Sequence, residues 1–87
     1  MKVVNRPIEM IATFTKNGIV RPAKFRMQTE EQSEIVIKVE RIIAQNLEKL
    51  AGNKMLVYRC QSIINGRERI YELKYELDTC KWVLFKI

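Results

Sequence analysis

Five basic residues could contact phosphate groups: Lys24, Arg26, Arg59, Arg67 and Arg69. The first three stand next to apolar residues in alternating runs, which turns their side chains outward from a strand. The last two flank an Asn-Gly pair. The chain carries 16 Lys and Arg against 10 Asp and Glu, a net charge of +6, which suits nucleic acid, an acidic partner or simple solubility. If the strand order brings the five together, they predict a face that contacts nucleic acid or other anions; otherwise they are ordinary surface charge.

Catalytic and metal-binding chemistry has few candidates. The chain has no histidine, which removes the commonest general base and most catalytic metal sites, and its three glycines form no phosphate-binding loop. Glu30, Glu31 and Glu34 could hold a hard cation, but a solvated polar loop explains them more simply. Cys60 and Cys80 are too few for a zinc site and are expected as reduced thiols. We predict no enzymatic activity, no metal and no cofactor.

The segment from Lys49 to Lys54 is a further candidate for anion binding. Its two lysines enclose Gly52 and Asn53. Successive backbone N–H groups in such a turn can form a concavity for an anion. The alternative interpretation is a plain connection between two strands.

Hairpins are the elements that must position these groups. The pairs Asn17-Gly18 and Asn65-Gly66 lie between apolar-rich runs, and this dipeptide suits the type I′ turn of a hairpin. Residues 69–77 alternate apolar and polar side chains with the period of two of a strand. Pro22 indicates an edge or a bulge. The predicted hairpins join residues 8–15 to 19–27 and residues 54–64 to 69–77.

The aromatic side chains could stack nucleic-acid bases, but the phase of their strands turns them inward. The sequence therefore predicts them as core residues: Phe14, Phe25, Tyr58, Tyr71, Tyr75 and Trp82.

A last strand, residues 81–87, is apolar on both faces. Trp82 and Leu84 occupy one face, and Val83, Phe85 and Ile87 occupy the other. A half-buried strand should have one polar face. Either a loop or terminus covers the second face, or Val83, Phe85 and Ile87 form a partner surface, including that of a homodimer.

Residues 30–51 fit either a helix or a strand. Thr29 and Gln32 resemble a capping box, and apolar residues follow with helical spacing up to Gly52. Against a helix, residues 34–43 include six β-branched side chains, which favour a strand. Periodicity leaves both open.

The chain resembles short hypothetical proteins of Gram-positive bacteria. It departs from their pattern at Met27, where an aromatic residue is usual, and in residues 28–34, which lack a glycine turn. The resemblance implies a small β-barrel with a strand at residues 35–43, and no known activity. The residues that carry it are Pro22, Phe25, Val39, Lys49, Ala51, Gly52, Tyr58-Arg59-Cys60, Arg67-Glu68, Tyr71, Leu73 and Trp82.

Together these patterns predict one domain over residues 1–87. We expect an all-β, antiparallel, SH3-like or OB-like barrel of five to six strands with little or no helix. The expected function is a non-enzymatic protein-interaction module, with nucleic-acid binding through a basic outer face as the alternative. An unknown protein partner, a homodimer and nucleic acid are all open, and no segment suits a membrane. The lack of an apolar export signal at the start favours the cytoplasm.

Overall fold

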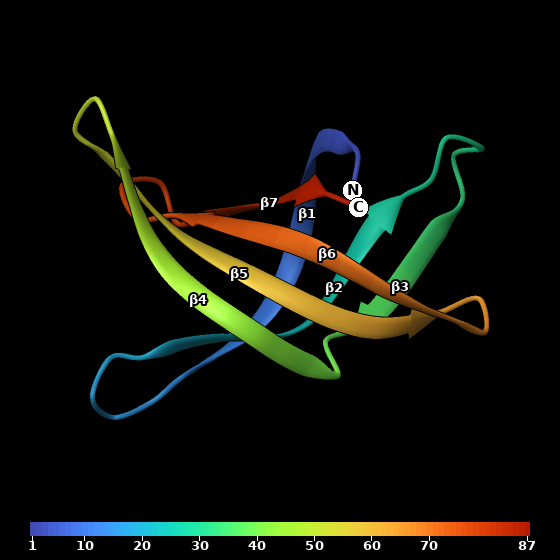
Figure 1. Cartoon of the computed structure of the whole chain (residues 1–87), viewed down its shortest axis with the longest axis horizontal. Coiled ribbons are helices and arrows are strands. Elements are labelled where there is room, and N and C mark those ends of the chain that lie inside the picture. The colour runs from blue at the N-terminus through green and yellow to red at the C-terminus, as the bar shows by residue number, and fades with distance from the viewer.

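The protein, described by a computed structural model of all 87 residues, is a single seven-stranded antiparallel β-sheet (Figure 1). The strand order in space is β3-β2-β1-β7-β6-β5-β4, so the first and last strands of the chain pair in the middle of the sheet. The chain has no helix of the kind that spans a membrane. The prediction of an all-β fold without helix is confirmed, but five to six strands were too few. The strands are β1 (Val3–Phe14), β2 (Val20–Gln28), β3 (Glu34–Lys38), β4 (Arg41–Leu50), β5 (Asn53–Ile64), β6 (Arg67–Glu76) and β7 (Lys81–Lys86).

The sheet curls into a half-barrel whose two halves pack their inner faces together. Figure 1 shows β4, β5 and β6 in front of β1, β2 and β3. Phe25 on β2 meets Tyr71 on β6 edge-on, with ring centroids 5.7 Å apart. Trp82 on β7 packs against Tyr58 and Tyr75, at 5.5 and 4.7 Å. These five aromatic residues are buried as predicted, and their large apolar area is the main stabilising contribution to so small a core.

The turns differ from expectation in one of the two predicted hairpins. Asn65 and Gly66 both have positive φ (51° and 75°), as a type I′ turn requires. In the first hairpin only Gly18 has positive φ, and the Thr15 N–H donates to the Ile19 carbonyl at 2.9 Å. That loop is therefore longer and uses glycine alone in the left-handed region, so the prediction of a type I′ turn there was wrong.

The ambiguous middle of the chain is strand, but it is two strands where the resemblance implied one. β3 ends at Lys38 and β4 begins at Arg41. At the break, the Val39 N–H still donates to Ala23 on β2 at 2.9 Å, whereas the Glu40 carboxylate accepts a hydrogen bond from the Ile63 N–H on β5. The chain thus crosses from one half of the sheet to the other at these two residues.

Ser62 on β5 closes the half-barrel at this crossing. Its hydroxyl lies 2.6 Å from the Lys38 carbonyl and 2.6 Å from the Tyr71 hydroxyl, and it is almost fully buried. A serine hydroxyl has one proton, which the Lys38 carbonyl must receive because it can only accept. The Tyr71 hydroxyl therefore donates to Ser62. This chain of hydrogen bonds joins β3, β5 and β6 across the interior.

Replacing Ser62 by alanine is expected to lower the free energy of unfolding by about 1–3 kcal/mol, because a partly buried carbonyl and a buried phenol would each lose a partner. Urea unfolding measures the loss. The matched control is Thr79→Ala, which removes a hydroxyl whose only hydrogen bond, to Glu76, is exposed. Equal losses in the two variants would show that the Ser62 network does not hold the crossing together.

Candidate functional site

The basic residues predicted to contact phosphate do not form one face. Lys24 and Arg26 lie on the outer face of β2, and Arg59 lies on the outer face of β5. Since the inner faces of β2 and β6 touch through Phe25 and Tyr71, these outer faces point in different directions. Strand order therefore separates the cluster.

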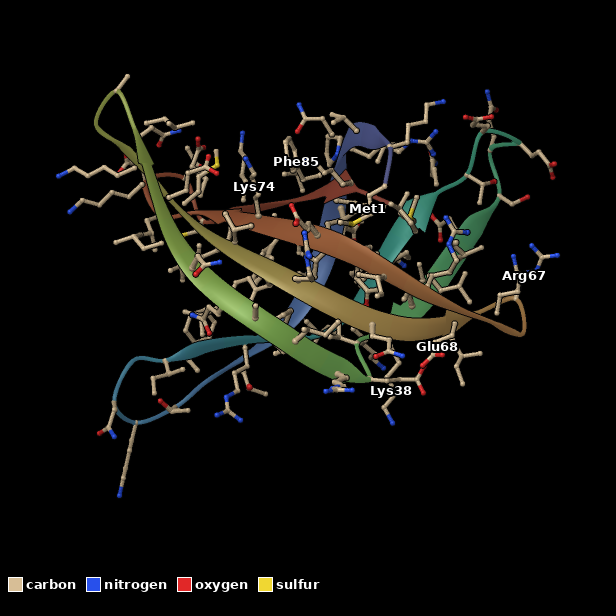
Figure 2. The ribbon with its side chains drawn as sticks, in the orientation of Figure 1. Met1, Lys38, Arg67, Glu68, Lys74 and Phe85 are labelled. Atoms are coloured by element: carbon tan, nitrogen blue, oxygen red, sulfur yellow. The ribbon has the colours of Figure 1, made fainter.

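Two of the five basic residues are also neutralised by neighbouring carboxylates. Arg26 pairs with Glu9 and, at 3.8 Å, with Glu34, and the Glu9 hydrogen bond raises the pKa of Arg26. Arg59 donates to Glu72 at 2.9 Å. Figure 2 shows Arg67 at the far end of the β5–β6 hairpin, pointing away from the sheet. Arg69 stands opposite Ser62, close to the same hairpin.

The predicted partner surface on β7 is split by a bulge. Val83 and Phe85 do lie on the outer face, but the register of β6 with β7 shifts between Glu72 and Leu73, so that β7 has one additional residue at this point. The shift turns Ile87 back inward, where it packs against the core. The three residues therefore do not share a face, because the bulge changes the phase that simple alternation predicts.

Lys74 covers much of what remains of that surface. Its Nζ lies 3.7 Å from the centroid of the Phe85 ring and 3.1 Å from a carboxylate oxygen of Glu48. Figure 2 shows the Lys74 side chain beside Phe85. The cation stacks on the ring while it neutralises the carboxylate, so Phe85 is only half-exposed and its cover comes from the chain itself.

The candidate cation ligands are held apart. Glu30 pairs with Arg6 at 3.3 Å, and Glu34 pairs with Arg26. No three carboxylates or thiols converge in the fold. Cys60 is buried and Cys80 is exposed, and both are free thiols. Burial raises the pKa of Cys60 to about 12, which makes its thiol unreactive at neutral pH.

The feature that sequence reasoning missed is the free edge of β4. This strand lies at one end of the sheet and pairs only with β5. Eight of its ten residues are exposed, among them the large apolar side chains of Ile43, Leu47 and Leu50. The opposite edge, β3, has five residues with Glu34 and Lys38 at its ends. Short, charged edges resist further pairing, whereas a long edge with apolar side chains invites it.

The free edge of β4 presents backbone groups at alternate residues. In an antiparallel pair, opposed residues alternate between those that exchange hydrogen bonds and those that do not. The Leu77 N–H donates to the Lys54 carbonyl at 3.1 Å, so the backbone groups of Lys54 face β6. Lys49, which lies opposite Lys54 on β4, therefore forms no backbone hydrogen bond with Lys54. By the same alternation, the N–H and C=O groups of Gln45, Leu47 and Lys49 point away from β5.

The side chains of these edge residues face the interior, on the open side of the half-barrel. In Figure 1, β4 and the β1–β2 hairpin diverge on this side. The Tyr58 hydroxyl donates to the Val20 carbonyl at 2.7 Å and lies 3.5 Å from Nε2 of Gln45. Beside this bridge, Leu47 remains 60% exposed and Phe14 remains 63% exposed, although Phe14 was predicted as core. Both side chains have the inward phase, and no strand covers them.

One sequence signal marks this edge. Lys49 has the inward phase of β4, and a charge with that phase is typical of an edge strand. This signal could not be recognised in the sequence because residues 30–51 also fit a helix. In a helix, alternate residues do not share a face.

No protein-family model, curated protein or solved structure matches this chain.

Proposed function

We propose that the protein is a non-enzymatic interaction module that binds an extended segment of another protein along the free edge of β4. The observation that carries this proposal is the combination, at Gln45, Leu47 and Lys49, of backbone groups directed to the edge and side chains directed to the open interior. An added strand would form hydrogen bonds with these backbone groups and would cover these side chains. This is the mode of recognition called β-augmentation.

The chemistry of the edge favours a peptide over a nucleic acid. An edge strand offers alternating donors and acceptors, which another strand matches and a row of phosphates does not. The large apolar side chains exposed on β4 are aliphatic and none is aromatic, so they suit apolar side chains better than stacked bases. The separation of Lys24 and Arg26 from Arg59, two of which are ion-paired, gives the nucleic-acid alternative less support.

The experiment is a selection from a displayed library of random dodecapeptides, followed by affinity measurement of the selected peptides by fluorescence anisotropy. We expect peptides that bind the natural chain to lose about tenfold or more in affinity for Leu47→Pro. Proline has no N–H, and its ring occupies the place where the added strand would approach. Because the Leu47 N–H faces the free edge, the variant should fold normally.

Two further variants make this test specific. Leu47→Ala keeps the N–H and removes the side chain, so it should weaken binding less than proline does. Asn46→Pro removes an N–H that faces β5, so it should lower the melting temperature, which Leu47→Pro should not. Peptides that bind Leu47→Pro as tightly as the natural chain would refute strand addition at β4.

A further inference from the structure

Two lysines face each other on the inner side of the β4 edge. Lys49 on β4 is the direct cross-strand partner of Lys54 on β5, and neither forms an ion pair. Theirs is the closer, non-hydrogen-bonded type of pair, and like charges placed opposite each other are destabilising. The sheet therefore carries an uncompensated repulsion beside the backbone groups that are free to bind.

The surroundings of the edge do not relieve this repulsion. Between Arg41 and Lys54 the only acid is Glu48, which points to the outer face and is held by Lys74. Across the opening, the β1–β2 turn carries Lys16 and no acid between residues 14 and 20. The open side thus offers positive charge together with the apolar side chains of Leu47 and Phe14.

A second copy of this chain that pairs edge to edge with the inner faces aligned does not supply the missing negative charge. If two β4 edges paired with their inner faces aligned, Lys49 would face an inward residue of the other strand, and these are Ile42, Gln45, Leu47 and Lys49. The other free edge, β3, directs Ile35 and Ile37 inward. No such pairing sets a carboxylate opposite Lys49, and some set a lysine there.

We infer that the occupant of the β4 edge is an acidic, extended segment of a different protein. Its strand places an apolar side chain opposite Leu47 and an aspartate or glutamate, two residues away, opposite Lys49. The spacing follows from the period of two of a strand, since both side chains must point to the same face. This inference rests on the proposed function and adds the chemistry of the partner to it.

Another pair of opposed lysines, Lys24 and Lys38, provides a control. It lies on the outer face of β2 and β3, away from the β4 edge. Reversing Lys24 to glutamate changes the net charge and relieves a like-charge pair just as reversing Lys49 does. The two variants differ only in whether the altered charge lies beside the free backbone groups.

The test repeats the dodecapeptide selection with the natural chain, Lys49→Glu and Lys24→Glu. We expect the natural chain and Lys24→Glu to select an acid two positions from an apolar residue, and Lys49→Glu to select a lysine or arginine there. For a selected acidic peptide, replacing its acid by glutamine should weaken binding to the natural chain about fivefold. The same replacement should not weaken binding to Lys49→Glu.

The outcomes separate this inference from the proposed function. Peptides that depend on the Leu47 N–H but show no charge preference would overturn the acidic partner and leave strand addition standing. Failure to select any peptide would overturn both. A concentration-dependent dimer in analytical ultracentrifugation that Leu47→Pro abolishes would show that a second copy is the occupant, contrary to the inference.

Discussion

Leu73→Asp will leave the chain unfolded at room temperature. Leu73 has no exposed surface and stands in the register between Tyr58 on β5 and Leu84 on β7, both buried. Aspartate would lose the apolar burial and place an unpaired charge in the core. Either effect costs several kcal/mol, and a domain of this size has only about 5–15 kcal/mol of total stability. Loss of dispersed amide resonances in NMR spectra would confirm unfolding.

Ile70→Asp is the matched control for this prediction. Ile70 lies on the same strand, but it is 47% exposed, on the outer face. An aspartate there remains hydrated and should change the free energy of unfolding by about 0.5 kcal/mol or less. If both variants fold, or both unfold, the assignment of inner and outer faces along β6 is incorrect.

Raising the pH above 10 will unfold the protein cooperatively. Burial raises the pKa of Tyr58 and of Tyr71 from 10 to about 12, and that of Cys60 to about 12. In the unfolded chain these groups ionise at their ordinary values. Since the folded state binds each proton more tightly, its stability is complete below about pH 9, where Cys60 begins to ionise in the unfolded chain, and is lost as the pH rises toward 12. Each tyrosine contributes on the order of 2–3 kcal/mol to this loss.

Tyrosinate absorbance provides the measurement, because the pKa of each of the three tyrosines is raised above its usual value. A hydrogen bond with Cys80 and burial raise the pKa of Tyr75 as well. In the folded protein Tyr58 and Tyr71 should therefore remain protonated at pH 10, and most of the rise in absorbance should accompany the loss of β-sheet circular dichroism. A titration of two or more tyrosines near pH 10, with the sheet intact, would contradict the burial of Tyr58 and Tyr71.

The strands that the sequence predicted best are those whose alternation is complete and whose turn chemistry is explicit. Residues 71–76 alternate strictly and come soon after Asn65-Gly66, and both the strand and its type I′ turn are present. The β4–β5 turn was harder to recognise because Ala51 adopts positive φ (49°) there. Alanine rarely adopts positive φ, so the residue preferences that indicate a turn do not include it at this position.

The candidate sites depended on how the strands pair and in what order, and the sequence of a single strand does not contain this information. Alternation placed Val83 and Phe85 on the outer face correctly, but the bulge that turns Ile87 inward arises from the pairing of β7 with β6. Likewise, Lys24 and Arg59 each point outward as predicted, and only the order of strands separates them. The β4 edge was missed for the same reason, since an edge is defined by the absence of a neighbour.

The pairing of β1 with β7 has a consequence for the rate at which the fold forms. Strands β1 to β3 form one meander of local hairpins and β4 to β7 form another, whereas the contact of β1 with β7 joins residues from opposite ends of the chain, such as Val3 and Lys86. Closing so long a loop has the largest entropic cost of any step in this topology. The two meanders should therefore form first and dock last. Formation of the β1–β7 seam is then the step that limits the rate of folding, so variants that weaken this seam should slow folding.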